Sequence, residues 1–238
     1  SVPAGGVALV TNAAVVAGLP RWTPDTPRLL RLEISVAGKD GTDVVNERFG
    51  FRAYTREGRR FLLNGIPVTV LEALMQPDSL RAQWKTWWGA NAIRRPGCPD
   101  QLDAADEEGY LTRMVQEAIY PAGNVDNPPE PPASFDAPFV QLETAMFETF
   151  YNHPSVYMFC LGNELDGHGY FRAQTAKRYG RLFGSIAAAF KAIDPDRPVC
   201  GSGDAIADFF RDRAWNVHYP HEYSIAHDLP RSGMLLSE

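Results

Sequence analysis

One short stretch of the sequence places an acid directly after an apolar run. Residues 156–161 carry no charge, and Gly162, Asn163 and Glu164 follow at once. An uncharged run of this length is typical of a strand buried on both faces, as in a parallel sheet. The carboxylate then lies at the carboxyl end of the strand, which is the catalytic edge of a (β/α)8 barrel. The alternative is that Asn163 and Glu164 cap the next element or face solvent.

The composition argues against several classes of partner. The chain has 238 residues, 45% of them hydrophobic, and a formal net charge of -6. This length allows one large domain or two smaller ones. The negative charge argues against nucleic acid and anionic membrane, and no apolar run is long enough to cross a bilayer. Cys98, Cys160 and Cys200 predict neither a metal site nor a disulfide framework. The compartment stays open, and a soluble periplasmic or secreted protein is compatible with these features.

The first 52 residues predict β structure. Apolar and polar residues alternate over 30–36, which indicates a strand with one buried face. A turn over residues 39–41 predicts a second strand over about 44–52. Residues 7–10 and 13–16 are weaker strand candidates. We interpret this region as the end of an antiparallel sandwich.

From residue 53 onwards, strands and helices alternate. Asn64 and Gly65 predict a hairpin turn before a first barrel strand. Further strands are predicted over 91–94, 111–117, 156–161, 199–201, 215–218 and 234–238. Helices are predicted from about 79, over 100–108, 139–150, 179–193 and 205–211. This pattern predicts a helix-covered parallel sheet, a (β/α)8 TIM-type barrel with seven strands present and the eighth missing. Trp84, Trp87 and Trp88 recur at helical spacing, which favours core packing over a sugar platform.

Three stretches together resemble glycoside hydrolase family 2, the group of β-galactosidases, β-glucuronidases and β-mannosidases. They are RFGFR at 48–52 with FLLNGIPV at 61–68, NAIR at 91–94, and NHPSV at 152–156 with GNE at 162–164. Their order and spacing extend along nearly the whole chain. The resemblance implies that residues 1–52 end an immunoglobulin-like β-sandwich domain and that residues 53–238 form a catalytic barrel.

The resemblance also implies a retaining exo-β-glycosidase that uses two carboxyl groups and needs no redox cofactor. Family members sometimes bind Mg or Na ions near the site, but no residues of this sequence have a spacing that predicts a metal ligand set. Glu164 would be the general acid/base. Glu238 would be the nucleophile, because the family ends its seventh strand in a pair similar to Ser237-Glu238. In such a mechanism the two carboxyl groups lie about 5–5.5 Å apart. Negative charge on the nucleophile raises the pKa of its partner.

Four further residues have expected roles near these carboxyl groups. Asn163 would hydrogen-bond the 2-hydroxyl of the sugar. Arg94 would keep the nucleophile ionised, or else form an ordinary salt bridge under the barrel rim. Tyr219, or alternatively His218, would donate a hydrogen bond to the nucleophile, unless both side chains serve in packing. We interpret His153 as a residue that fixes the turn before the strand.

One departure from the family pattern leaves the sugar open. Gly97-Cys98-Pro99 stands where the family usually has a His-aromatic-Pro segment. A galactoside, a glucuronide, a mannoside or an unusual plant or algal glycan is therefore compatible with the sequence. The expected partner is a carbohydrate, with a homo-oligomer or a further polypeptide that completes the barrel as additional expectations. The alternative function is a non-catalytic carbohydrate-binding or interaction module derived from a glycosidase barrel.

Overall fold

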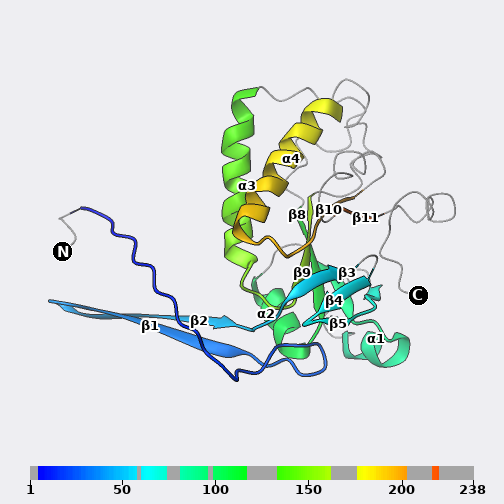
Figure 1. Cartoon of the computed structure of the whole chain (residues 1–238), viewed down its shortest axis with the longest axis horizontal. Coiled ribbons are helices and arrows are strands. Elements are labelled where there is room, and N and C mark those ends of the chain that lie inside the picture. The colour runs from blue at the N-terminus through cyan, green and yellow to red at the C-terminus, as the bar shows by residue number, and fades with distance from the viewer. Residues whose placement is uncertain are drawn as a thin grey trace.

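The computed structural model describes residues 5–57, 60–73, 81–95, 99–116, 133–161, 176–202 and 216–219. A body is built around a six-stranded sheet, and a two-stranded ribbon projects from it (Figure 1). The strands of the sheet are β6 (Glu72–Ala73), β7 (Ala92–Arg95), β8 (Leu111–Gln116), β9 (Val156–Leu161), β10 (Val199–Ser202) and β11 (Asn216–Tyr219). The helices are α1 (Arg81–Trp88), α2 (Pro99–Glu108), α3 (Asp136–Phe150) and α4 (Ala176–Ile193), with a short 3-10 helix, η2 (Ala133–Phe135). None of the described helices is long and apolar enough to span a bilayer.

The six strands of the sheet lie in the same order in space as in the sequence, and every neighbouring pair is parallel. Strand β9 lies inside the sheet, and all six of its residues are buried. This confirms the prediction from its uncharged sequence, because an interior strand of a parallel sheet is covered on both faces. The predicted strand over 234–238 and the predicted helix over 205–211 lie outside the described residues.

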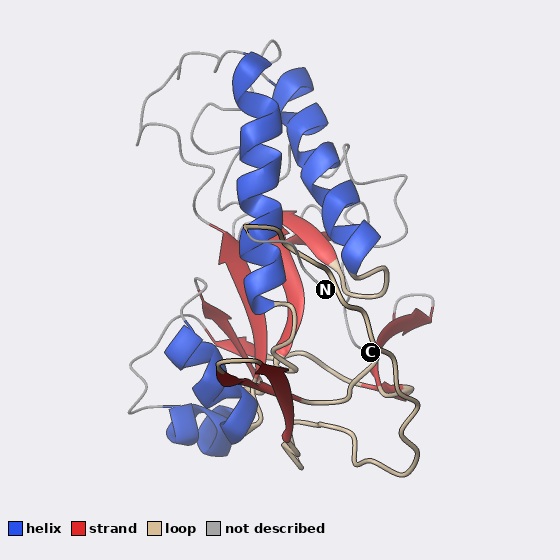
Figure 2. Cartoon of the chain, turned by 90° about the vertical axis from the view of Figure 1, so that its left-hand side faces the viewer, coloured by secondary structure: helices blue, strands red, loops and turns tan. Residues whose placement is uncertain are grey.

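Helices α3 and α4 lie side by side over the outer face of the sheet (Figures 1 and 2). The buried residues of α3 are Phe139, Glu143, Phe147 and Phe150, which recur along one stripe of the helix. The Phe147 ring lies 4.3 Å from the Phe190 ring of α4 and 4.5 Å from the Phe159 ring of β9, between ring centroids. These aromatic contacts join the two helices to the central strand.

Helix α2 ends at Gly109, as the sequence predicts. Gly109 has a φ of +73°, and a Cβ at this position would lie 2.0 Å from the carbonyl oxygen of Pro24. Only glycine fits both the left-handed backbone and the close approach. The prediction that the helical tryptophans are core residues is wrong for Trp87 of α1, which is 71% exposed. The side chains of Trp84 and Trp88 lie outside the described part of the chain. The helix has eight residues, and Trp87 lies on its uncovered side.

A small antiparallel sheet precedes the barrel strands. It consists of β3 (Tyr54–Glu57), β4 (Arg60–Leu63) and β5 (Ile66–Pro67). The predicted hairpin turn is confirmed, with φ values of 56° at Asn64 and 82° at Gly65, as a two-residue turn of this type requires. Sequence reasoning missed β3. Tyr54 and Phe61 stack at 5.6 Å and pack with Tyr157 of β9, so this small sheet covers part of the inner side of the barrel strands.

The ribbon consists of β1 (Leu30–Gly38) and β2 (Gly41–Phe49), paired antiparallel through a turn at residues 39–40. The two strands confirm the alternating pattern, but the expected buried face is wrong. Ile34 is 46% exposed and Val36 is 65% exposed, because no other layer of the described chain packs on the ribbon. The candidate strands over 7–10 and 13–16 are also wrong, since these residues adopt no regular secondary structure.

The segment on either side of the ribbon docks against the body. The Trp22 side chain is fully buried, and its Nε1–H donates to the carbonyl oxygen of Asp106 in α2 at 2.8 Å. A Cβ at Gly50 would lie 2.9 Å from the Trp22 Cβ and 3.0 Å from Pro154. Glycine at position 50 therefore allows the chain to pack closely beneath β9.

Candidate active site

The carboxyl ends of the parallel strands meet along one edge of the sheet. In the register of the strands, Gln116 of β8 lies beside Leu161 of β9, and Gly201 of β10 lies on the other side of Leu161. Ser202 is paired with Tyr219 of β11. The Gly162-Asn163-Glu164 stretch begins directly after Leu161. Strand β9 therefore ends at the edge where barrels of this architecture carry their active sites.

The predicted site residues divide into two groups. Arg94 lies in β7 and is partly buried, and His218 and Tyr219 are the last two residues of β11, where the structure describes their backbone. The sheet thus brings the strands that carry these three residues to the same edge. Asn163, Glu164 and Glu238 lie outside the described residues. Their roles, and the separation of the two carboxyl groups, stay predictions.

Arg94 lies on the inner face of the sheet. Its neighbour Ile93 packs with Ala105 and Tyr110 on the side of α2, whereas Ala92 belongs to a cluster with Tyr157 and other residues of the inner face. Successive residues of a strand point to opposite faces, so Arg94 shares its face with Ala92. This is the face on which a residue can reach the interior of a barrel.

Sequence reasoning missed a buried ion pair on the same inner face. The guanidinium of Arg113 in β8 donates from Nε and Nη2 to the two carboxylate oxygens of Glu72 in β6, at 2.7 and 2.5 Å. The Arg113 side chain is 3% exposed. The Tyr157 hydroxyl donates to the same carboxylate at 3.4 Å, and Arg113 Nη1 lies 4.0 Å from the Cys160 sulfur. The sequence signal that could have revealed this ion pair is Arg113, a charged residue inside a predicted strand of a helix-covered sheet.

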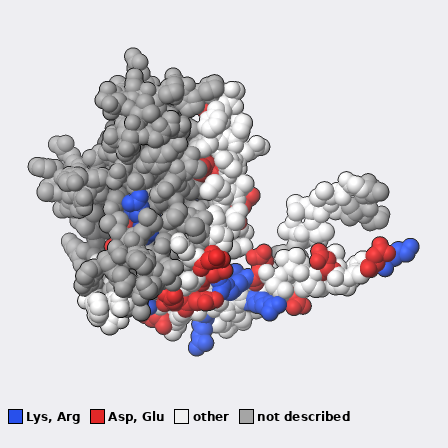
Figure 3. Space-filling view, turned by 180° about the vertical axis from the view of Figure 1, so that it is seen from behind, with Lys and Arg blue, Asp and Glu red and all other residues white. Residues whose placement is uncertain are grey.

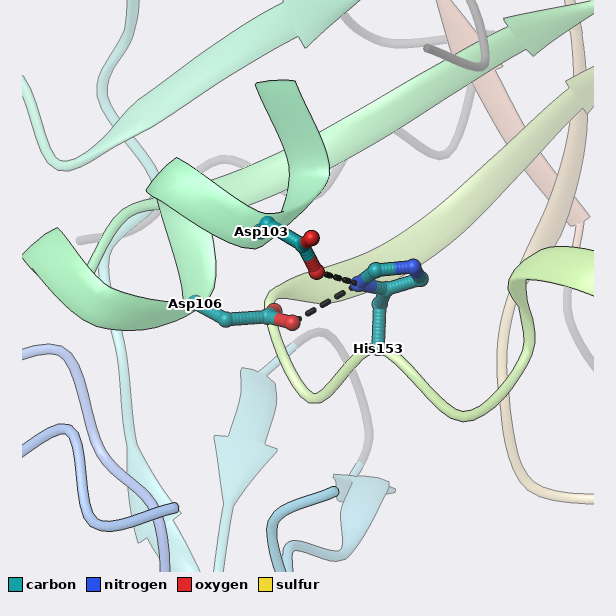
Figure 4. A group of neighbouring side chains, drawn as sticks. All are labelled: Asp103, Asp106 and His153. Carbon is teal, nitrogen blue, oxygen red and sulfur yellow. Dashed lines mark hydrogen bonds and ion pairs between the residues drawn. The ribbon is translucent and has the colours of Figure 1, made fainter. Parts of the chain in front are cut away.

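At the opposite end of β9, Asp106 holds the turn that leads into the strand (Figure 4). Its buried carboxylate accepts a hydrogen bond from the Ser155 backbone N–H at 2.9 Å and another from His153 Nδ1–H at 2.7 Å. The Tyr54 hydroxyl donates to the Pro154 carbonyl in the same turn, and burial raises the pKa of that hydroxyl. His153 thus fixes the turn, as the sequence analysis interpreted it.

Asp103, Asp106 and His153 also have the donor types of a metal site. Their ligand atoms lie within 4.8 Å of one another. However, Arg48 of β2 pairs with Asp103 and Glu107, and the Asp106 carboxylate already accepts two hydrogen bonds. Burial opposes the charge of Arg48, but these two acids outweigh it and raise the pKa of its guanidinium. These contacts connect the ribbon and the turn before β9 to α2, so we interpret the cluster as structural.

The exposed charges on the face in Figure 3 are mixed in sign. Acidic and basic side chains alternate along the ribbon and over the adjoining body. In the part of the surface that is described there, no large field of one sign faces solvent.

Glu143 is a second buried acid, but it lies away from this edge. It occupies the packed stripe of α3, with both carboxyl oxygens buried and without a hydrogen-bond partner. Burial raises the pKa of this carboxyl from its ordinary value of 4.5 to about 7. Its surroundings are those of helix packing, so we do not assign it to the candidate active site.

A parallel sheet in sequence order, with helices on its outer face and polar residues at its carboxyl edge, is the arrangement found in α/β barrels of the TIM type. Residues 84–231, more than half of the chain, match the family described as "Glycosyl hydrolases family 2, TIM barrel domain". The chain therefore belongs to glycosyl hydrolase family 2. This confirms the resemblance and the TIM-type fold, whereas the immunoglobulin-like domain and the missing eighth strand stay predictions.

Two curated relatives are β-galactosidases. The chain is 28% identical over 234 residues to β-galactosidase BgaC of Bifidobacterium adolescentis, which covers 87% of this chain and 21% of that protein. It is 32% identical over 228 residues to the β-galactosidase large subunit of Leuconostoc lactis, which covers 82% of this chain and 34% of that protein. The chain thus spans about a fifth to a third of these relatives.

A solved structure has the same fold. Bacteroides uniformis β-glucuronidase 2, covalently bound to cyclophellitol-6-carboxylate aziridine, superimposes with a TM-score of 0.68 at 19% sequence identity. The match covers 90% of this chain and 30% of that one. At this identity the likeness establishes the fold.

Proposed function

We propose that this chain is the catalytic-barrel part of a retaining exo-β-glycosidase that hydrolyses a terminal β-linked sugar by double displacement. The observation that carries the proposal is the position of β9. This buried strand lies inside a parallel sheet of a family 2 barrel, and the sequence Gly162-Asn163-Glu164 follows its carboxyl end directly. The β-galactosidase and β-glucuronidase names of the relatives support a glycosidase without selecting the sugar.

Glu164 and Glu238 have complementary tasks in the proposed reaction. Glu238 attacks the anomeric carbon as a carboxylate, while Glu164 gives its proton to the departing glycosidic oxygen. A covalent glycosyl-enzyme ester forms at Glu238, and the aglycone leaves as an alcohol. Glu164, now a carboxylate, takes a proton from water, which attacks the ester and releases the sugar with its original anomeric configuration.

Three other residues adjust the charge and the hydrogen bonds around this pair. Arg94 lies on the inner face of β7, where its positive charge lowers the pKa of the nucleophile and keeps it ionised. Tyr219 is the last residue of β11. We assign to it the hydrogen bond donated to Glu238, with His218 as the alternative donor. Asn163 hydrogen-bonds the 2-hydroxyl of the sugar, a contact that strengthens in the transition state.

Release of phenols from aryl β-glycosides tests the two carboxyl roles separately. Phenolate is a poor leaving group and needs the proton of Glu164, whereas 2,4-dinitrophenolate leaves without it. We expect Glu164→Gln to lower the phenyl glycoside rate about 10²–10⁴-fold and to affect the glycosylation step of the dinitrophenyl glycoside much less. Glu238→Gln should abolish turnover of both substrates, since no nucleophile remains.

Glu148→Gln is the matched control, because Glu148 is an exposed acid on α3. Its rates should equal those of the unaltered chain. Equal rates for Glu164→Gln and the unaltered chain would remove Glu164 from catalysis. Proton NMR of the first-formed sugar decides the stereochemistry, and an inverted anomer would contradict double displacement. Saturable binding of a glycoside without turnover by the unaltered chain would instead favour the alternative function, a non-catalytic carbohydrate-binding module.

A further inference from the structure

Strand β1 of the ribbon has an open edge. Among the described strands it pairs with β2 alone, and no backbone hydrogen bond of the described chain reaches its other side. The pairing runs without a bulge from Leu30 opposite Phe49 to Gly38 opposite Gly41. The ribbon extends away from the body (Figure 1), and residues 31–38 are all exposed. Such an edge presents a row of N–H and C=O groups to which a further strand can pair.

The sequence of β1 lacks the features with which edge strands usually prevent pairing. Natural edge strands are blunted by lysine, proline or a bulge. Strand β1 contains no proline and no lysine, and its two charged residues, Arg31 and Glu33, have opposite signs. A two-stranded ribbon is also only marginally stable by itself, whereas three or more strands with an apolar face support one another. Both arguments favour the addition of a strand to β1.

The ribbon has one apolar face and one polar face. Leu30, Leu32 and Ile34 share a face, because alternate residues of a strand point to the same side. Leu32 is 47% exposed, and Val45 of β2, which is opposite Ile34, is 50% exposed. Contiguous apolar surface of this kind marks interaction sites. A strand that pairs with β1 must therefore match an apolar row on one face and the charged row of Arg31 and Glu33 on the other.

A second copy of β1 meets this requirement in one antiparallel register. When a two-fold axis passes through Leu32, Arg31 of each copy lies directly opposite Glu33 of the other. The same register places Leu30 opposite Ile34. Residues that are opposite each other on antiparallel strands lie on the same face. Opposite charges therefore meet on the polar face, and aliphatic side chains meet on the apolar face.

The charges select this register over its neighbours. An axis through Arg31 or through Glu33 would bring identical charges together, which destabilises a strand pair. An axis through Ile34 would place both charges opposite uncharged residues, and an axis between two residues would set polar side chains against apolar ones. Within the described chain, Glu33 has no ion-pair partner, and Arg31 donates from Nε to Asn46 Oδ1 at 2.9 Å. Glu33 and the Nη groups of Arg31 thus remain for a second copy.

We propose that β1 is a self-association strand, through which two copies of this chain join into a four-stranded antiparallel sheet in the order β2-β1-β1-β2. The Arg31–Glu33 pair occurs twice, because a two-fold interface repeats each contact. One strand pair forms a small interface, so we expect a dissociation constant on the order of micromolar. The surface lies on the ribbon, apart from the carboxyl edge of the barrel sheet, so this inference does not rest on the proposed glycosidase activity.

Sedimentation velocity of the full chain over a range of concentrations tests the proposal. We expect a reversible equilibrium between monomer and dimer. Arg31→Glu and Glu33→Arg each set like charges opposite each other and should raise the dissociation constant at least about tenfold. The double variant Arg31→Glu/Glu33→Arg restores both ion pairs with reversed polarity and should return the constant close to that of the unaltered chain. Glu47→Arg, an equal change of charge on β2, is the matched control and should have little effect.

Hydrogen exchange at low and high protein concentration is a second measurement, and it needs no variant. The amides on the outer edge of β1 should become protected as the dimer forms. Those on the outer edge of β2 should exchange at the same rate at both concentrations. This measurement keeps the test decisive even when a variant fails to fold by circular dichroism.

Several outcomes would overturn the proposal. They are a monomer at every concentration, a dimer that both single charge variants leave intact, and a folded double variant that stays monomeric. A dimer that is lost in Val45→Lys but kept in both charge variants would show that the ribbons stack face to face instead. A monomer whose β1 amides are already protected would show that another part of the same chain, such as the exposed segment 7–16, occupies the edge.

Discussion

Strands β9 and β1 use similar side chains in opposite surroundings. Both are rich in aliphatic or aromatic residues, but every residue of β9 is buried, whereas β1 is exposed along almost all of its length. Strand β9 has parallel neighbours on both edges and the aromatic stripe of α3 and α4 on its outer face. Among the described strands, β1 pairs with β2 alone. The difference shows that the sequence pattern of a strand predicts its extended backbone. The burial of its side chains depends on which other elements pack against it.

The energetic contrast between the two regions follows from apolar area removed from water. Burial stabilises by roughly 25 cal/mol per Å² of apolar surface, and loss of packed atoms adds a cavity cost. An apolar side chain on β9 therefore contributes to the folded state far more than the same type of side chain on β1. Substitutions at three positions, one in β9, one in the helix that covers it and one in β1, test this contrast from the largest expected effect to the smallest.

The largest effect is expected for Phe159→Ala in β9. The Phe159 ring is fully buried, lies 5.7 Å from the Phe190 ring and has the Arg197 guanidinium 5.4 Å from its centroid. Its removal loses aromatic contacts with both covering helices and leaves a cavity. We expect a loss of about 3–5 kcal/mol in the free energy of unfolding, measured by urea titration. A change below about 1 kcal/mol would contradict the tight packing of this region.

A pH-dependent effect is expected at Glu143, the charged exception in the packed stripe of α3. Its pKa is about 7 in the folded chain against an ordinary 4.5. Well below pH 4.5 the group is protonated in both states, so it contributes no pH dependence to the stability. As pH rises from about 4.5 to 7, the unfolded state loses the proton first, so the folded state loses stability. The total loss is on the order of 3 kcal/mol.

Glu143→Leu and Glu143→Gln test this explanation. Both should be more stable than the unaltered chain at pH 8 and should remove most of the decline in stability between pH 5 and 7. The measurement is the melting temperature at half-unit pH steps. Leu should stabilise more than Gln, because it brings no amide that needs a partner. An unchanged decline in Glu143→Leu would assign the pH dependence to another group.

The smallest effect is expected on the ribbon. Ile34→Thr keeps a β-branched side chain, and Ile34 is 46% exposed. We expect a change within about 0.5 kcal/mol by the same urea titration. A loss above 2 kcal/mol would show that another layer covers the ribbon in solution.

Much of the fold could be predicted because its signals are local. Asn64-Gly65 adopts the positive φ values of a tight hairpin, Gly109 ends α2, and the uncharged stretch 156–161 forms an interior strand. The failures arise from contacts between distant segments. Trp87 has the spacing of a core residue, but its side chain is exposed on α1. The ribbon strands have the alternating pattern of half-buried strands, but no other described element packs on their apolar face.

The candidate site divides in the same way. The sequence pointed to Arg94, and the structure sets Arg94 in β7 on the inner face, beside the strand of Arg113. It did not point to Glu72, because the stretch around Glu72 contains no motif like the one that marks Glu164. Glu72 and Arg113 are 41 positions apart, and only parallel pairing through β7 brings them together.

The sequence by itself predicted most of the described barrel strands and helices, the family, and the position of Glu164 just after a buried strand. These depend on short-range properties, such as hydrophobic period, turn residues and local motifs, which act within a few residues. Only the tertiary structure decided which charges lie inside the barrel wall, that Asp106 holds the turn before β9, and that Glu143 is buried without a partner. Those outcomes depend on long-range packing, because the solvent exposure of a charge depends on elements that are distant in the chain.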